Sequence, residues 1–356
     1  MASAAAPMVC CGMIPVLEAV PNFSEGRDPG FLREVTVEMT RAGAEVLDAS
    51  SDPDHHRSVV TLIGGVGEIE DALVAGAEVA LRAVDLRRHR GVHPRIGALD
   101  VAPVVPLAGT GMETARATAY RVAVRVAALG VPVYLYASST PEHRSLADLR
   151  RGGFESLVDG FPTGRRPDFD AGRTSAHPTA GVTCVGARAL LLAWNLQVEG
   201  ISFDALSMVA RELRESGGGL PGVRALALRL ERAGTLQLSM NLEEVERRDP
   251  DAVFERASTD VAARGGRIVA TEVIGLIPDA LVLRTGARRL RLLGADSQRL
   301  LSTRLVSHLA RRGSGDLDTL VNWARAASAG APPEVLAAAE RLHSSSHIPP
   351  PPVDQA

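Results

Sequence analysis

A chain of 356 residues is long enough for two domains of about 150 residues each, and a hydrophobic fraction of 46% is ordinary for a folded globular protein. A net charge of −3 and an aromatic fraction of 3% argue against nucleic-acid binding, which needs a basic face or stacking platforms. No apolar run approaches the roughly 18 residues that cross a membrane. We therefore expect no membrane association. The three cysteines have no spacing typical of disulfide or metal pairs, so we expect a reducing, cytoplasmic setting.

The sequence contains no lysine, so all 39 residues counted as lysine or arginine are arginines. This excludes enzymes that depend on a Schiff-base lysine, a P-loop lysine or a kinase lysine. An anionic substrate must therefore be bound by arginine, histidine or backbone N–H groups.

Hydrophobic periodicity in the first half predicts strands and helices that alternate along the chain. Tight turns between some of the strands indicate a mixed sheet within an α/β fold. The predicted strands are 14–19, 45–49, 57–64, 101–107 and 131–138, and the predicted helices are 31–44, 67–86, 113–129 and 142–151.

The stretch Asp85–Asp100, DLRRHRGVHPRIGALD, is the most informative in the chain. Pro94 restricts His93 to an extended conformation, and Arg95 lies two residues on, close enough to share its face. A histidine beside a guanidinium on a restrained loop can hold and deprotonate a small anionic substrate. A loop histidine can also be solvated and inert, and His89, near the end of a predicted helix, fits that interpretation.

Residues 160–181 interrupt the alternation with a stretch rich in glycine, proline and arginine. Composition alone favours two interpretations equally, a linker between domains or a binding loop.

The second half predicts the order βαββαβ, which is that of a ferredoxin-like unit. Its strands are expected at 187–198, 224–231, 235–242 and 267–273, and its helices at 204–216 and 251–264. From residue 306 the composition changes to two Ala-rich helical stretches and a Pro-rich tail that we expect to be disordered. We therefore expect domains at 14–186 and 187–305, followed by a tail at 306–356.

A metal site is the first alternative to weigh, because five histidines could meet. No HExxH motif or helical His pair flanked by glutamate occurs, so we expect no metal. The glycine-rich stretches at 64–67 and 216–222 do not match a phosphate-binding motif, and no GxSxG motif supports a serine nucleophile. The five histidines are His55, His56, His89, His93 and His177.

Several long segments, in order, carry a resemblance to a known family. They are VPNFSEGRD (20–28), DPDHHRSVVTLIGG (52–65), RRHRGVHPRIGALDVAPVVPL (87–107), VPVYLYA (131–137), HPTAGVTCVGAR (177–188), SGGGLPGVRAL, LSMNL and EVIGLIP. The chain resembles the glutamate formimidoyltransferases, the transferase part of formiminotransferase-cyclodeaminase, over about residues 14–305, without the cyclodeaminase domain. It departs from the family pattern at residues 170–175 and at Ser50 and Ser51.

The resemblance implies an α/β (α+β) fold of two ferredoxin-like formiminotransferase subdomains with mixed sheets, a folate-binding cleft between them, and a homodimer. It implies a one-carbon transferase of histidine degradation that moves the formimino group of N-formimino-L-glutamate to N5 of tetrahydrofolate, a co-substrate. In the family's HPR motif the histidine is the catalytic base, here His93.

One histidine with a pKa near neutrality could take a proton from the folate amine and give one to the leaving glutamate nitrogen. Arg57, Arg95 and Arg173 are candidates to bind substrate carboxylates, and Asn22 is a further substrate-binding candidate. The resemblance assigns folate binding to Gly172, Arg173, Thr174, Ser175, Ala176, His177, Pro178, Thr179, Ala180 and Gly181.

Two alternatives remain at this point. The same fold could act on another donor, such as N-formylglutamate or formiminoglycine, because these donors differ by one heteroatom or one side chain. The second alternative is a folate-binding protein without activity, which the departures from the family pattern at residues 50–51 and 170–175 suggest.

Overall fold

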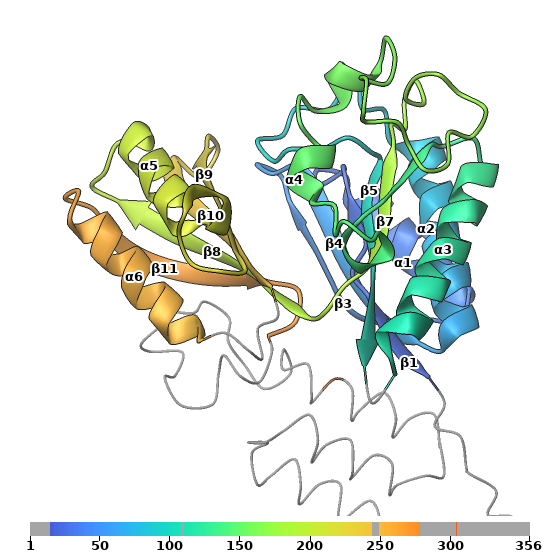
Figure 1. Cartoon of the computed structure of the whole chain (residues 1–356), viewed down its shortest axis with the longest axis horizontal. Helices are drawn as coiled ribbons and strands as arrows, with labels where there is room; N and C mark the ends of the chain where they lie inside the picture. Colours follow the sequence, from blue (N-terminus) through green and yellow to red (C-terminus); the bar gives the residue numbers. More distant parts are fainter. Residues whose placement is uncertain (1–14, 108–109, 244–248, 278–303, 305–356) are drawn as a thin grey trace, which may run out of the picture.

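The computed structural model describes residues 15–107, 110–243, 249–277 and 304. They form two α/β units, each a sheet with helices on one face, and the two sheets lie between the two sets of helices (Figure 1). We call β1 to β7 with their helices the first unit, and β8 to β11 with theirs the second unit.

The first unit contains a seven-stranded sheet, and this sheet is mixed, as predicted. The strand β5 is parallel to β7, β7 is parallel to β6, and the other pairs are antiparallel. The short strands β1 and β2 follow one another in the same place between β4 and β5. The strands are β1 Val16–Ala19, β2 Asn22–Phe23, β3 Glu45–Asp52, β4 Arg57–Gly64, β5 Leu99–Leu107, β6 Val133–Leu135 and β7 Thr183–Ala187.

Helices α1 Pro29–Arg41, α2 Val66–Ala83 and α3 Met112–Ala128 cover one face of this sheet. Their apolar stripes face a single core, in which Leu17, Leu62 and Leu73 are fully buried. Asp28 caps α1 by accepting a hydrogen bond from the N–H of Gly30.

Two predicted elements of the first unit are shorter than expected. The strand expected at 131–138 is reduced to β6, because Ala137 adopts φ 49° and begins a 3₁₀ turn. The helix expected at 142–151 is reduced to the single turn α4 Leu146–Leu149, which Gly152 and Gly153 follow with positive φ. Strands β2 and β7 were not predicted as separate elements.

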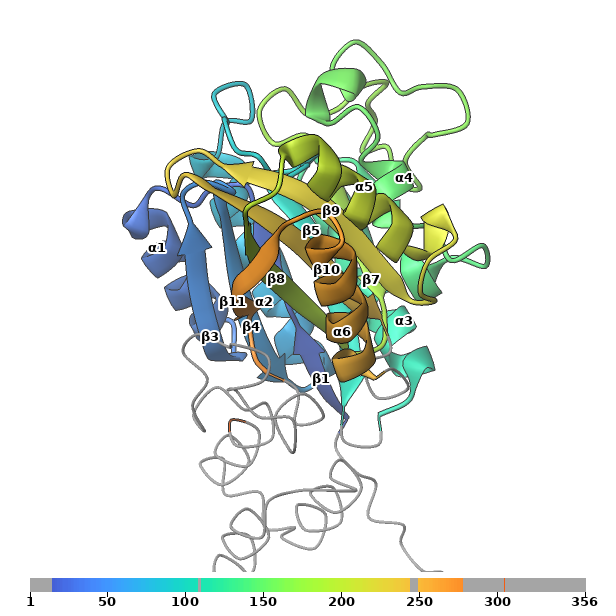
Figure 2. The ribbon, with the colours of Figure 1, turned by 90° about the vertical axis from the view of Figure 1, so that its left-hand side faces the viewer.

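The second unit confirms the predicted βαββαβ order. The strand order β11-β8-β10-β9 is that of a ferredoxin-like sheet, and every pair is antiparallel, so this sheet is not mixed. The elements are β8 Leu191–Glu199, α5 Phe203–Leu213, β9 Val223–Leu230, β10 Thr235–Glu243, α6 Pro250–Ala262 and β11 Arg267–Ile274. Helices α5 and α6 lie on the outer face (Figure 2).

The interpretation of residues 160–181 as a linker between the domains is wrong. The segment leads into β7, which pairs with β5 and β6 in the first sheet. The chain passes from the first unit to the second after this segment, between β7 and β8. The predicted tail at 306–356, and most of the stretch from 278 to 305, lie outside the described residues.

Contacts between the units are both polar and apolar. Leu276, after β11, packs against Leu47 and Ile63 of the first sheet. Asp54 accepts hydrogen bonds from the backbone N–H groups of Arg232 and Ala233, in the turn between β9 and β10. Among the described residues, the second unit therefore contacts the first unit both on its sheet and at the turn between β3 and β4.

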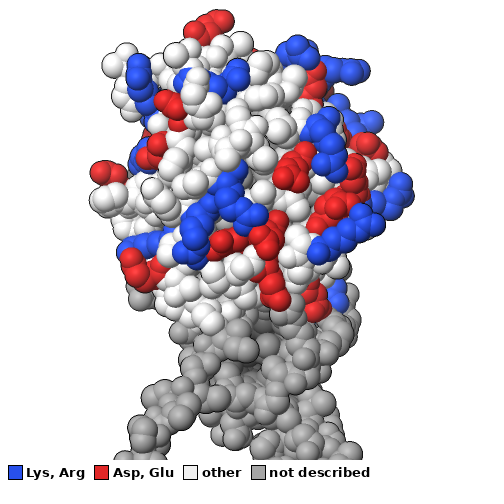
Figure 3. Space-filling view, turned by 90° about the vertical axis from the view of Figure 1, so that its right-hand side faces the viewer, with Lys and Arg blue, Asp and Glu red and all other residues white. Residues whose placement is uncertain are grey.

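The outer helical face of the first unit carries charges of both signs in alternation (Figure 3). Several are paired across helices, as in Arg121 with Glu70 and Arg125 with Asp71. In the part of the chain that the structure describes, no helix is both long and apolar enough to span a membrane.

Candidate active site

His93 lies on a loop between α2 and β5 that is fixed by hydrogen bonds to other segments. The N–H of Val92 donates to the carbonyl of Asp54 at 3.1 Å, and the carbonyl of Arg95 accepts from Phe154 at 3.0 Å. The carbonyl of Ile96 accepts from Val182 at 2.9 Å. These contacts hold the backbone on both sides of the half-buried His93.

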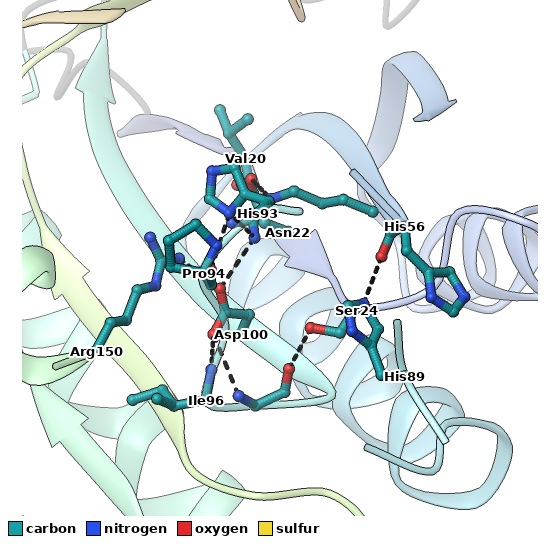
Figure 4. Close-up of polar contacts among 12 residues, drawn as sticks. Val20, Asn22, Ser24, His56, His89, His93, Pro94, Ile96, Asp100 and Arg150 are labelled. Atoms are coloured by element: carbon teal, nitrogen blue, oxygen red, sulfur yellow. Dashed lines mark hydrogen bonds and ion pairs between the residues drawn. The ribbon is translucent and has the colours of Figure 1, made fainter. Parts of the chain in front are cut away.

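The closest charged neighbour of His93 is Arg57, at the start of β4. Arg57 Nη1 lies 3.1 Å from His93 Nδ1. Figure 4 shows His93 close to Asn22, with Asp100 beside them. Its Nε donates to Asn22 Oδ1 at 2.9 Å, and the amide of Asn22 donates to the carbonyl of Val20. The structure thus brings three predicted residues, His93, Arg57 and Asn22, into one connected group.

Asp100, at the start of β5, anchors this group and was not predicted. It is fully buried, and its Oδ1 accepts hydrogen bonds from the N–H groups of Ile96 and Gly97 at 2.8 and 3.2 Å. Its Oδ2 accepts from Arg57 at 3.1 Å and from Arg150 at 2.5 Å. Two guanidiniums share one carboxylate, so the group carries a net positive charge.

Burial and this charge together lower the pKa of His93. Burial, Arg57 and Arg150 together hold the pKa of its imidazole well below the usual 6.5. The expectation of a pKa near neutrality is therefore wrong for the ligand-free protein. At neutral pH His93 is uncharged, which is the form that accepts a proton.

The contacts of His93 Nδ1 bear on the position of its proton. Nδ1 lies 2.8 Å from the carbonyl of Pro94, which can only accept a hydrogen bond. A proton on Nδ1 satisfies this carbonyl and leaves the lone pair on Nε2. Arg57 can donate a hydrogen bond to Nδ1 only in the opposite tautomer, in which Nδ1 is unprotonated and Nε2 carries the proton.

Three further histidines, His55, His56 and His89, lie close to the His93 loop. The rings of His55 and His93 are 5.8 Å apart, and those of His56 and His89 stack at 4.2 Å. His89 Nε2 donates to the carbonyl of His56, and burial lowers the pKa of His89 to about 4. Within the described ranges no three His, Cys, Asp or Glu side chains are close enough to hold a metal ion.

His177 belongs to a separate part of the site. Its Nδ1 accepts a hydrogen bond from the N–H of Ala180 at 3.1 Å, so the ring is held by its own loop. Burial and Arg173 lower its pKa.

Arg95 and Arg173 differ in how they are engaged. Both Nη atoms of Arg95 donate to the carboxylate of Glu155, at 2.9 and 2.7 Å. Arg173 donates only to the carbonyl of Ala176, at 3.5 Å, and forms no ion pair with any described carboxylate. Of the two, Arg173 is the guanidinium that is free to bind an anion.

Segment 172–181 lies directly beside the His93 loop. The N–H of Leu86 donates to the carbonyl of Thr179, and the N–H of Ala98 donates to that of Ala180. Gly181 has φ 70°, and a Cβ there would lie 2.0 Å from the carbonyl oxygen of Ile96. Gly181 is therefore needed for this close backbone contact.

Within this segment the side chains differ in exposure. Ala176, Ala180 and Gly181 are buried. A ligand can reach the exposed or half-buried residues, which are Gly172, Arg173, Thr174, Ser175, His177, Pro178 and Thr179. The departure at 170–175 begins with a turn, in which Asp170 accepts from the N–H groups of Gly172 and Arg173.

Comparison with known proteins gives consistent matches. The model of the formiminotransferase domain, N-terminal subdomain, matches residues 16–188, and that of the formiminotransferase domain matches residues 188–291. Glutamate formimidoyltransferase of Streptococcus pyogenes serotype M1 is 35% identical over 271 residues, 75% of this chain and 90% of the relative.

Two further relatives extend the comparison. Glutamate formimidoyltransferase of Thermoplasma acidophilum is 34% identical over 297 residues, 82% of this chain and 97% of the relative. Formimidoyltransferase-cyclodeaminase of Sus scrofa is 33% identical over 286 residues, 77% of this chain and 52% of the relative. The chain therefore matches about half the length of that longer protein.

Proposed function

Because the chain belongs to the formiminotransferase family and is a transferase, we propose that it moves the formimino group of N-formimino-L-glutamate to N5 of tetrahydrofolate. The products are 5-formiminotetrahydrofolate and L-glutamate, as in histidine degradation. The observation that carries this proposal is the neutral His93 beside Arg57 and Arg150, with their single counter-ion Asp100.

The proton transfers follow from the state of His93. With its own proton on Nδ1, facing the carbonyl of Pro94, His93 can accept the N5 proton on Nε2 as N5 of the folate forms a bond to the formimino carbon. The imidazolium then lies beside two guanidiniums, which make it a strong acid. It returns the proton to the glutamate nitrogen as the bond from that nitrogen to the formimino carbon breaks, and His93 is neutral again.

The net positive charge of the group suits the donor, which carries two carboxylates. Arg57 Nη2 makes no hydrogen bond to any described residue, so it can donate to a donor carboxylate. Arg95 can do the same only if its ion pair with Glu155 opens. We propose Arg57 as the first contact of the donor, with Asn22 fixing its orientation.

For the folate we propose a site that begins at segment 172–181 and continues between the two units. Arg173 has the free guanidinium for the glutamate tail, and His177 and Thr179 can line the path. We further propose that the units correspond to subdomains 14–186 and 187–305, and that the protein is a homodimer. Sedimentation of the purified protein tests the last point.

Anaerobic assay with both substrates tests the proposal, by detecting glutamate release and the formimino-folate product. Turnover with N-formimino-L-glutamate but not with N-formylglutamate or formiminoglycine supports the proposed donor, and kcat/KM ranks the three. If none of the donors is turned over while the protein still binds the folate, it is a folate-binding protein and the proposal is wrong.

A further inference from the structure

Glu18 is a buried residue, and one oxygen of its carboxylate accepts no hydrogen bond from the described residues. It lies on β1, in the middle of the first sheet, and only 3% of its surface is exposed. Its Oε2 is enclosed and has no hydrogen-bond partner within the described residues. An unpartnered buried carboxylate oxygen is costly, so its presence calls for an explanation.

The side chain of Glu18 lies on the face of the sheet that is turned toward the second unit. Its neighbours Leu17 and Ala19 belong to the core under the helices, so Glu18 points the other way. Val16, on the same side as Glu18, packs in a cluster with Leu276 of the second unit.

A second polar group lies next to it. Thr61 on β4 is a diagonal neighbour of Glu18, because Glu18 is paired with Ile63 and Thr61 lies two residues before it. The hydroxyl of Thr61 is also enclosed without a partner in the described chain. On the sheet of the second unit, the side-chain amide nitrogen of the buried Gln237 also has no hydrogen-bond partner among the described residues.

Glu18 and Thr61 lie on the same sheet face as Asn22 and Arg57, the residues connected to His93. Glu18 is four residues from Asn22 along β1 and β2, and Thr61 is four residues from Arg57 along β4. A strand rises ~3.3 Å per residue, so Glu18 is ~13 Å from Asn22 along the sheet, and Thr61 is equally far from Arg57. A ligand that reacts at His93 and pairs with Glu18 would span this distance along the face.

We propose that Glu18, with Thr61 beside it, recognises the aminopyrimidinone edge of the reduced pterin, whose 2-amino group and N3–H donate to its carboxylate. This inference rests on the proposed function and adds an orientation to it. Two parallel N–H donors match a carboxylate as a guanidinium does. Arg188 is the charged neighbour that favours the ionised form of Glu18.

The proposal fixes the direction in which the folate lies. The carboxylate of Glu18 repels the glutamate tail, which is anionic, and favours the pterin end. Arg173 favours the tail, and its segment lies at the end of the first unit opposite to the start of β1 in both views (Figures 1 and 2). Burial raises the pKa of Glu18 to about 7, and the two N–H donors of the pterin favour its ionised form.

The test uses fragments of the folate on the full chain. We expect Glu18→Gln to weaken binding of 6-methyltetrahydropterin by about 10- to 100-fold, because a charge-assisted pair is lost. Binding of p-aminobenzoylglutamate, which lacks the pterin, should be unchanged. Glu199→Gln is a matched control, because this strand carboxylate is paired with Arg267 and exposed.

A ligand-side change distinguishes recognition from folding. Replacing the 2-amino group of the tetrahydropterin by methyl should weaken binding to the wild-type protein and have little further effect in Glu18→Gln. Equal losses in both proteins would overturn the proposal, as would a rise in the KM of formiminoglutamate alone, which would assign Glu18 to the donor's amidine. If the wild-type protein binds no reduced folate at all, it is the proposed function that fails.

Discussion

The carboxylate of Asp54 joins the two units, because its Oδ1 accepts a hydrogen bond of 2.9 Å from the backbone N–H of Arg232. The carbonyl of the same Asp54 accepts from Val92, the residue before His93. One residue thus touches both the second unit and the catalytic loop. We therefore expect the position of the second unit to be coupled to the position of His93.

We expect Asp54→Ala to weaken this coupling. Two hydrogen bonds to a carboxylate are lost at a partly exposed position, which should lower the free energy of unfolding by about 1 kcal/mol. The KM for tetrahydrofolate should rise several-fold, because its proposed site lies between the units. Glu231→Ala, an exposed residue of the same hairpin turn, is the control, and equal kinetics for the two variants would contradict the coupling.

His93→Ala tests the base itself. We expect kcat to fall by about 10²- to 10⁴-fold, because proton transfer is lost, while the Kd of the folate stays within a few-fold. His143→Asn is the control, since His143 is exposed and has φ 50°, which asparagine tolerates. A parallel loss of folate affinity in His93→Ala would assign His93 a positioning role instead.

Much of this fold follows from patterns that the sequence displays. Apolar periodicity predicts the long helices and the second unit, because each of these elements buries one face. It does not predict β2, which is too short for a period to be visible, and it overestimates the length of the helix that becomes α4. Residues 160–181 were ambiguous because composition does not reveal their pairing with the His93 loop, which depends on contacts distant in sequence.

The candidate site was predicted only in part, for a related reason. His93 and Arg57 lie in conspicuous polar motifs, but Asp100 and Glu18 each occur as one charge within an apolar strand. Such a charge is costly to bury without partners, and that is the signal by which both could have been found. Arg150 gives no signal of this kind, because it follows α4 rather than lying within an apolar strand. Its partner Asp100 is 50 residues away in the sequence.

The pH dependence of the reaction should reveal the low pKa of His93. Burial, Arg57 and Arg150 lower that pKa, so the imidazole stays neutral well below pH 6.5, and kcat/KM should decline only at more acidic pH. In Arg150→Gln the pKa should rise, because one of the two guanidiniums is gone. The acidic decline of kcat/KM should then move to higher pH.

The profile of kcat reports the complex with substrate. The carboxylates of the bound donor offset part of the positive charge near His93, so the pKa in the complex should be higher than in the free protein. The acidic decline in kcat should therefore occur at higher pH than the decline in kcat/KM. Arg166→Gln, at an exposed position, should leave both profiles unchanged. Identical profiles for the wild type and Arg150→Gln would contradict this account of the His93 pKa.

Asp100→Asn should destabilise the protein more than Asp54→Ala does. It leaves two largely buried guanidiniums without their counter-ion, which should cost about 3–5 kcal/mol in urea unfolding. Burial alone would raise the pKa of Asp100, but Arg150 and Arg57 outweigh it and lower that pKa. The contribution of Asp100 to stability is therefore present above its unfolded pKa of about 3.9 and is lost as the pH falls below that value. Unfolding at neutral and at acidic pH should therefore show a smaller difference between variant and wild type at acidic pH. A stability difference that does not change with pH would contradict this role for its charge.

The last prediction concerns Arg173, which we propose binds the glutamate tail of the folate. Its guanidinium pairs with no described carboxylate, so a tail carboxylate meets no competitor there. We expect Arg173→Ala to raise the Kd of a polyglutamylated folate more than that of the monoglutamate, because added glutamates add negative charge near this position. The Kd of 6-methyltetrahydropterin should not change, because it lacks the tail. Arg166→Ala is the control, an exposed arginine of the same loop region. If Arg173→Ala weakens the pterin fragment as much as the full folate, then Arg173 acts on the fold of its segment, and the tail must bind elsewhere.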